Sequence, residues 1–358
     1  AVETVYTRSV RKTRNASAVE TRRFFPFRVD YGPVTYDIEL VGSGPAATAA
    51  TAAFDDIDAR VVSDADDPAL TLAVVPAGSD ISGAFDRYER LVTVEIGGVG
   101  GHVVQRLDAS VSVFGSGGAE FADLRTRVAA STDSDGSPAG DRSAGAIAGR
   151  RAVALLAGDD TVAGTVVDVV GTEVAGRHRI LPVPDPDSRD RTVRRDHREV
   201  EVDDSLARAE RALDERTGIV AQVGERESFP IPYYLAQTAD TTGFSDVRSA
   251  EFAAGVDPDW DVAFMKALGE ALERYCAGVY RRSEFTVASE RTRSSPVSPS
   301  QFVRPDGWDT VNAETPLPWV EGVDLRTDET VALPAEFVHY PPPTERHKPA
   351  ITTGLGLG

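Results

Sequence analysis

A strand, a glycine-rich turn, an alanine-rich helix and a second strand follow one another in the segment YDIELVGSGPAATAATAAFDDIDARVV. Its apolar runs predict strands at Ile38–Val41 and Ala59–Val62, with a helix at Ala46–Phe54 between them. The apolar runs Leu70–Val75 and Leu91–Ile96 predict two further strands. Strands that alternate with helices are typical of α/β folds, so we expect a small, open, mostly parallel sheet with helices.

The chain as a whole predicts two domains joined by a linker. Within the first domain, residues 131–145 (STDSDGSPAGDRSAG) lack periodicity and predict a loop. The following AIAGRRAVALLAGDD predicts a helix, and TVAGTVVDVVGTEVAGRHRILPVP predicts a β-pair or strand. A solvated linker is expected at 185–202, where both signs of charge alternate. We therefore expect an α/β domain at 34–184 and a second domain at 203–358.

The first 33 residues differ in charge from the rest of the chain. Residues 1–33 begin at Ala1 and carry a net charge of +4, whereas the remainder carries −23. We expect a disordered basic extension upstream of a natural start near Val34. A basic arm with a function of its own is the alternative, and a tryptic peptide from this segment in native protein would favour it.

Acidic residues dominate the composition. There are 57 Asp and Glu against 38 Lys and Arg, and the net charge is −19. The only lysines are Lys12, Lys266 and Lys348. This composition is similar to that of halophilic proteins, with a plain acidic mesophilic protein as the alternative. Nucleic acid is disfavoured as a ligand because phosphates require a basic surface, and acids dilute the arginines of residues 191–195.

The sequence also limits the compartment and the metal chemistry. Cys276 is the single cysteine, which excludes an internal disulfide and a multi-cysteine zinc site. The five histidines show no metal-ligand spacing. No apolar stretch approaches the roughly 20 residues of a membrane span, and no signal-peptide pattern is present. A soluble, cytoplasmic protein without membrane contact is the default expectation.

Two helices are predicted in the second domain. In DDSLARAERALDERTG, Asp204 is the expected N-cap, an apolar stripe follows it, and Gly218 is the expected end. In GVDPDWDVAFMKALGEALERYCAGVY, Asp257 is the expected N-cap and Pro258 the first helical residue. On this second helix, residues 262–279, one stripe is predicted to face the core: Met265, Leu268, Leu272, Cys276 and Val279.

Lys266, Glu270 and Glu273 form a second face of the same helix. Their spacing has two interpretations. One is a solvated face with i,i+4 pairing between Lys266 and Glu270, worth about 0.3–0.5 kcal/mol. The other is a pair of carboxylates one turn apart that helps to hold Mg²⁺, which takes one or two carboxylates and completes its shell with water and phosphate oxygens. Spacing alone favours the solvated face.

KALGEALERYC resembles the ALGE-x-x-ERL/Y helix of the YcaO family, ATP-dependent enzymes that modify peptide backbones. Other segments agree in order: DERTGIV with Thr217 and Gly218, then WVEGVDLRTDETVALPAEFVHYP, then TTGLGLG. The resemblance covers about residues 203–358 and implies the N-terminal part of an α+β YcaO-type domain. It also implies an ATP and Mg²⁺ site in which Glu270 and Glu273 are the first pair of metal-binding glutamates.

The resemblance also implies a reaction. In the family, ATP phosphorylates an amide oxygen, and a neighbouring Cys, Ser or Thr side chain then attacks to leave an azoline ring. External sulfide gives a thioamide instead, and some relatives assist methylthiolation. The family has further glutamates after its glycine-rich stretch, whereas this sequence stops at Gly358. We therefore expect a fragment of a longer protein, with a degenerate relative as the alternative.

The first domain has two interpretations of its own. Gly42, Gly44 and Ala47 imitate a dinucleotide fingerprint, with Asp64 where an acid would bind the ribose. The segment also resembles the ubiquitin-activating-enzyme-like domain that binds leader peptides for YcaO proteins. Where such domains often have a CxxC zinc pair, AEFADLR has Glu120 and Asp123, so no zinc is expected.

GGVGGH (97–102) lacks the Lys and Ser/Thr of a P-loop and predicts a glycine-rich turn or bulge.

Together these patterns favour ATP-dependent cyclodehydration of a peptide or protein substrate, whose leader would bind the first domain. A non-catalytic peptide-binding or scaffold module is one alternative, and a Rossmann-type NAD or flavin oxidoreductase is another. The sequence leaves the oligomeric state open, with a homodimer as one assembly.

Overall fold

The computed structural model describes residues 36–344 apart from 56, 80, 82–87, 117, 129–137, 184–198 and 303–311. The predictions for the basic extension, for most of the linker and for TTGLGLG lie outside the described residues.

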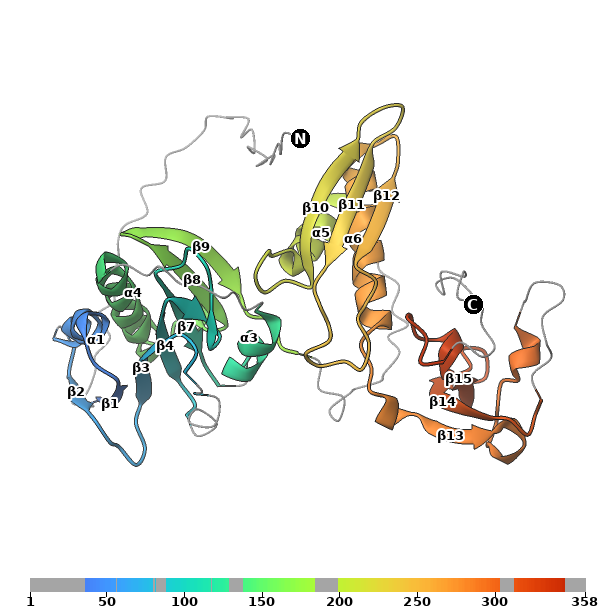
Figure 1. Ribbon diagram of the computed structural model, residues 1–358, viewed down its shortest axis with the longest axis horizontal. Helices are drawn as coiled ribbons and strands as arrows, with labels where there is room; N and C mark the ends of the chain where they lie inside the picture. The colour runs from blue at the N-terminus through green and yellow to red at the C-terminus, as the bar shows by residue number, and fades with distance from the viewer. Residues whose placement is uncertain are drawn as a thin grey trace. The chain divides into compact units, whose positions relative to one another are not determined.

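The first part of the chain is built on a seven-stranded sheet with the order β2-β1-β3-β4-β7-β8-β9 (Figure 1). The strands are β1 (Tyr36–Val41), β2 (Ala59–Val62), β3 (Leu70–Pro76), β4 (Leu91–Ile96), β7 (Ala109–Phe114), β8 (Thr165–Val170) and β9 (Glu173–Arg179). The α/β prediction is confirmed, and the first four strands run parallel. The sheet as a whole is mixed, because β7, β8 and β9 each run antiparallel to the preceding strand.

Helices α1 (Pro45–Thr51) and α4 (Pro138–Leu156) cover one face of this sheet and pack against each other. The prediction of a loop over 131–145 is wrong from Pro138 onwards, where α4 begins. Its glycines allow close helix packing: a Cβ on Gly145 would lie 2.1 Å from the Ala46 carbonyl oxygen, and one on Gly149 would lie 2.3 Å from that of Ala50. A glycine-rich sequence taken alone favours a loop. Here the glycines lie inside a helix because α1 packs too closely for larger side chains.

The other face of the sheet carries a second apolar cluster with helix α3 (Phe121–Arg127). The short hairpin of β5 (Gly98–Val99) and β6 (His102–Val103) also belongs to this part of the chain. It begins within GGVGGH, ends at Val103, and confirms the prediction of a glycine-rich turn there.

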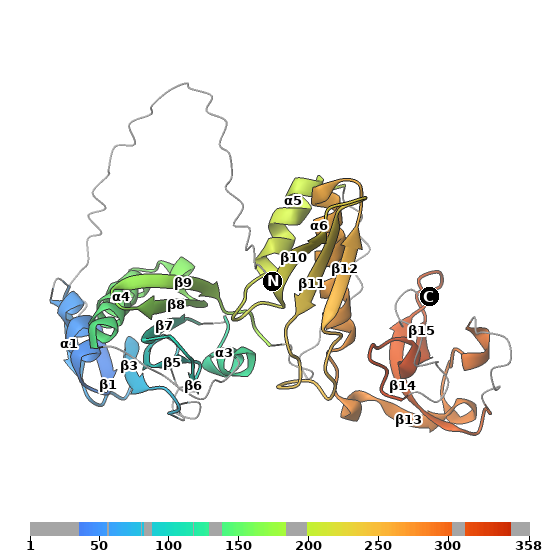
Figure 2. The ribbon, with the colours of Figure 1, turned by 45° about the horizontal axis from the view of Figure 1, so that its top comes forward.

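The middle part of the chain is an antiparallel sheet of β10 (Val220–Glu227), β11 (Tyr233–Thr238) and β12 (Phe252–Val256), packed against helix α6 (Trp260–Ala277) (Figure 2). Helix α5 (Val202–Ala209) contacts α6. Gly255 lets β12 approach α6 closely, because a Cβ there would lie 2.2 Å from the Ala263 carbonyl oxygen.

Both helices are confirmed, but their expected caps are corrected. Asp259, not Asp257, caps α6 by accepting a hydrogen bond from the Val262 N–H at 3.0 Å, and Pro258 therefore precedes the cap. In α5, Asp204 lies in the first turn and Glu201 is the N-cap residue. Gly218 belongs to a later turn, because α5 and the 3₁₀ turn after it end before Leu213.

The last described part is a three-stranded antiparallel sheet of β13 (Thr286–Ser289), β14 (Pro316–Val323) and β15 (Thr330–Pro334). Trp319 is buried in its core and donates a hydrogen bond to the Ala288 carbonyl oxygen at 2.9 Å. None of the helices in the described residues is long and apolar enough to cross a membrane.

Candidate functional site

The buried face of α6 is only partly the predicted one: Leu268 and Val279 are buried as expected, but the other three predicted residues are not. Its buried residues are three alanines, one leucine and one tyrosine, and they follow one stripe: Ala263, Ala267, Leu268, Ala271 and Tyr275. This stripe lies roughly 100° around the helix from the predicted one. Cys276 is exposed, so the prediction that it belongs to the core is wrong. Met265 and Leu272 are only partly buried. The small side chains face inward because Gly255 and its strand come too close for large ones.

The three charged residues of α6 do not pair with one another. Lys266 donates to the Asp257 carboxylate at 2.7 Å and to the Val256 carbonyl oxygen at 3.3 Å, so the expected Lys266–Glu270 pair is absent. Glu270 instead accepts two hydrogen bonds from Arg274, at 2.9 Å from Nε and 2.7 Å from Nη2.

Glu273 lies one turn after Glu270 on α6 and is exposed. Among the described residues it has no hydrogen-bond or ion-pair partner. The two glutamates thus supply one carboxylate held by an arginine and one that points into solvent. Within the part of the chain that the structure describes, no cluster of three or more His, Cys, Asp or Glu residues has the geometry of a metal site.

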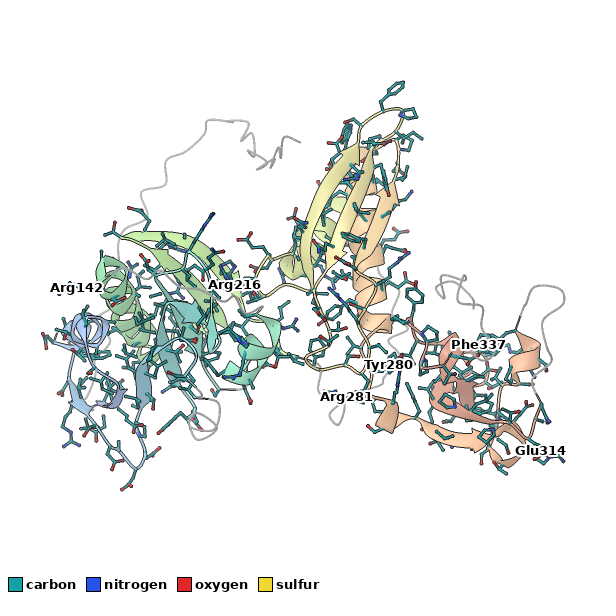
Figure 3. All side chains as sticks on the ribbon, in the orientation of Figure 1. Arg142, Arg216, Tyr280, Arg281, Glu314 and Phe337 are labelled. Atoms are coloured by element: carbon teal, nitrogen blue, oxygen red, sulfur yellow. The ribbon has the colours of Figure 1, made fainter. Side chains whose placement is uncertain are left out.

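A buried charge cluster joins the β8–β9 hairpin to the turn before β10. Arg216, a member of this cluster, is labelled in Figure 3. His178 contacts both neighbouring carboxylates, at 3.0 Å from Nδ1 to Asp214 and at 3.2 Å from Nε2 to Asp168. Arg216 pairs with the same oxygen of Asp168 at 2.6 Å. Sequence reasoning missed this cluster because its members are far apart in the chain.

A family model matches one segment of the chain, and solved structures match most of it. A family model described as "YcaO cyclodehydratase, ATP- and Mg²⁺-binding" matches residues 254–358. Residues 254–358 are therefore similar to the YcaO family. A search of curated proteins found no relative.

Two solved heterocyclase structures share the fold of most of this chain. A heterocyclase in complex with substrate and cofactor matches with 13% identity and a TM-score of 0.60, over 87% of this chain and 52% of its own. The heterocyclase TruD matches with 11% identity and a TM-score of 0.52, over 87% and 49%. YcaO from Methanopyrus kandleri, bound with AMPPCP and Mg²⁺, is 24% identical over 40% and 34%, with a TM-score of 0.28. The chain spans about half the length of the heterocyclases that it matches.

The YcaO match includes α6 with both glutamates and the strand before it. Thr217, from the segment DERTGIV, lies outside the match and is buried. Its hydroxyl donates to the Arg179 carbonyl oxygen on β9 at 2.7 Å. The threonine therefore contributes to the contact between the turn before β10 and the first sheet.

The dinucleotide-like turn does not form a recognisable nucleotide cradle. A Cβ on Gly42 would lie 2.0 Å from the Val74 carbonyl oxygen, so this glycine serves the close approach of β3. Ala46 and Ala50 of α1 pack against the glycines of α4. A hollow of about 620 Å³ lies elsewhere, between α1 and β2, and neither Gly44 nor Asp64 lines it.

Glu95, at the end of β4, orients the GGVGGH turn from inside the protein. Its carboxylate accepts the N–H groups of Gly100 and Gly101 at 2.8 and 2.5 Å. Burial raises the pKa of Glu95 to about 7 against the effect of these hydrogen bonds. The turn is thus held by an internal carboxylate, a structural role for the glycine-rich segment.

Glu120 and Asp123, which stand where a zinc pair was considered, form the capping box of α3. Asp123 also accepts the Val183 N–H at 2.7 Å. Arg127, on the same helix, donates to the carbonyl oxygens of Leu181 and Pro182 at 2.6 and 2.8 Å. Hydrogen bonds therefore connect α3 to the segment LPV.

The same arginine reaches the YcaO helix. Nη1 of Arg127 lies 3.3 Å from the Tyr275 hydroxyl, and its guanidinium lies 5.9 Å from the centre of the Phe244 ring. Tyr275 follows Glu273 by two residues on α6. The helix that carries the candidate site is therefore in direct contact with the first part of the chain.

His178 makes stability depend on pH. Burial alone would lower its pKa, but the hydrogen bonds and charges of Asp168 and Asp214 outweigh burial and raise the pKa to about 9. The unfolded chain titrates near 6.5, so this stabilisation is complete below pH 6.5 and is lost as pH rises through 9. We expect the free energy of unfolding to fall by up to about 3 kcal/mol over this range.

Urea unfolding between pH 7.5 and 9.5 measures this loss of stability. The range lies above the pKa of Glu95, which is about 7, so that Glu95 contributes little to the slope. The variant His178→Gln has no proton to lose and is expected to show a much flatter profile. Equal slopes for the two proteins would contradict the assignment.

Proposed function

We propose that this chain provides part of an ATP-dependent enzyme that activates backbone amides of a peptide substrate, most simply for cyclodehydration of Cys, Ser or Thr residues to azolines. One observation carries the proposal: Glu270 and Glu273 lie one turn apart, away from the core face of α6, inside the segment that matches the YcaO model. The similarity of fold to a heterocyclase over 87% of the chain supports it.

The two side chains fit a magnesium–nucleotide complex in their chemistry. Mg²⁺ prefers carboxylate oxygens, takes one or two of them from a protein, and keeps the remaining positions for water and phosphate. Glu273 offers a carboxylate in solvent, and Glu270 offers one that Arg274 orients with two hydrogen bonds. When bound, Mg²⁺ and ATP would supply charge neutralisation and a phosphoryl group.

The protein's own contribution would then be positional. Asp259 fixes the start of α6, and the alanine stripe fixes its rotation against β12. This packing leaves Glu273 exposed and Glu270 partly exposed, beside the edge of β12, where Arg274 also donates to the Phe252 carbonyl oxygen at 3.2 Å. For the substrate, the family chemistry joins a side-chain oxygen or sulfur to the activated carbonyl carbon and expels phosphate with the former amide oxygen.

Calorimetric titration with AMPPCP tests the proposal, using this chain and a longer natural form side by side. We expect the longer form to bind at least about tenfold more tightly with Mg²⁺ than with EDTA, about 1.4 kcal/mol. We expect weaker binding by this chain, since half of a heterocyclase length is present. Failure of both forms to bind or hydrolyse ATP would favour a non-catalytic scaffold.

A further inference from the structure

The outer margin of the first sheet carries a group of arginines. Strand β9 is the edge strand of the sheet. Residues paired across β8 and β9 have side chains on the same face, so the pairs show which side chains of β9 lie on the face that α4 covers. Arg177 lies opposite Val167, which is part of the core beneath α4, and Arg179 lies opposite Thr165. Arg151 of α4 donates to the Thr165 hydroxyl at 2.7 Å. The strand and the helix thus present their arginines to the same side.

We call this surface the arginine edge and define it by Arg150, Arg151, Arg177 and Arg179. Burial, followed by the positive charges of Arg177 and Arg150, lowers the pKa of Arg151. Within the described residues, none of the four forms an ion pair with a carboxylate. In a protein of net charge −19, acids for pairing are abundant, yet in the described part of the chain none of them pairs with the arginine edge. Its positive charge is therefore available to a ligand.

The backbone of β9 is also available. Beyond its pairing with β8, the described residues form no backbone hydrogen bond with the segment 173–177. At the end of the strand, the Thr217 hydroxyl donates a hydrogen bond to the Arg179 carbonyl oxygen. Val174 on this strand is 41% exposed. An unpaired strand edge is a template for another extended chain.

We propose that the arginine edge binds an acidic, extended segment of the peptide substrate, which adds to β9 as a further strand and places its carboxylates beside the arginines. This inference rests on the proposed function, since it assigns the first part of the chain a role in holding that substrate. A peptide fits both features of the surface: its backbone pairs with β9, and its carboxylates pair with guanidinium groups.

Nucleic acid fits only one of these features. Phosphates would pair with the arginines, but a nucleic-acid backbone cannot add to a β-sheet. A long polyanion would also be repelled by the remaining surface of an acidic protein. A short peptide contacts only the arginine edge.

Fluorescence anisotropy without ATP tests the proposal. The probe is a fluorescein-labelled decapeptide of alternating glutamate and threonine, and the matched control peptide carries glutamine in place of glutamate. We expect the acidic probe to bind at least about tenfold more tightly than the control. We expect the double variant Arg151→Ala/Arg177→Ala to remove most of this difference, whereas Arg208→Ala, an exposed arginine on α5, leaves it unchanged. Circular dichroism confirms that the variants are folded.

A second probe separates strand addition from charge alone. The same decapeptide with alternate backbone nitrogens methylated keeps its charges but loses half of its N–H donors, and we expect it to bind at least about fivefold more weakly. Equal binding of both probes would overturn strand addition. Equal binding by the double variant, or tighter binding of a single-stranded decanucleotide, would overturn the peptide site. Because no nucleotide is present, these results do not depend on ATP turnover.

Discussion

Glu270→Gln and Glu273→Gln are each expected to lower Mg²⁺-dependent ATP turnover by at least about 100-fold in the longest natural form of this protein. Each change removes a negative charge that would hold the metal ion on the nucleotide phosphates. Their effects on folding should be small, because the pair between Glu270 and Arg274 lies on the helix surface and contributes about 0.5 kcal/mol. Phosphate release, measured beside thermal unfolding, separates the two effects.

Glu210→Gln is a suitable control, since this exposed glutamate lies on the 3₁₀ turn after α5. It is expected to retain full turnover. Unchanged turnover in both Glu270→Gln and Glu273→Gln would remove the site assignment, whatever the protein binds elsewhere. Loss of turnover with a matching loss of thermal stability would show a folding effect and would also count against a metal role.

Asp168→Ala is expected to destabilise the protein by about 3–5 kcal/mol at pH 7. The side chain of Asp168 is 4% exposed and pairs with both Arg216 and His178. Removing it leaves the Arg216 guanidinium without this carboxylate and leaves His178 with Asp214 alone. Removing one partner of a buried ion pair leaves the other charge buried without compensation. The loss of stability is therefore far larger than the net contribution of the intact pair. Urea unfolding followed by circular dichroism measures the loss.

Two comparisons make this prediction specific. Glu173→Ala, on the same hairpin but exposed, is expected to change stability by less than about 0.5 kcal/mol. The double variant Asp168→Leu/Arg216→Met replaces two charges by apolar groups and should recover part of the lost stability. A loss below about 1 kcal/mol for Asp168→Ala would show that the cluster is hydrated in solution.

The strands of the first sheet were predictable because their apolar runs are short and bounded by turn residues. Ala59–Val62 and Leu91–Ile96 are found where they were predicted. The direction of the later strands was not predictable. The hairpin of β5 and β6 connects β4 to β7 in place of a helix, and a connection without a crossover helix makes the two strands antiparallel.

For helix α6, the periodicity of the sequence predicted the helix but only part of its buried face. The sequence indicated the helix itself, but its large apolar residues suggested a face that is only partly the buried one. The choice depended on Gly255, whose strand approaches so closely that alanines must face it. Met265, Leu272 and Cys276 are consequently left toward the surface. The same change moved the pairing of Lys266 from Glu270 to Asp257.

The sequence by itself determined that the chain contains an α/β part and a YcaO part, and which helix carries the two glutamates, because local periodicity and an ordered set of motifs encode both. Only the tertiary structure decided which face of α6 is buried, where α4 begins, and that Asp168, His178, Asp214 and Arg216 form one charge cluster. These features depend on the approach of segments far apart in the chain, where steric contact and burial, not local propensity, set the free energy.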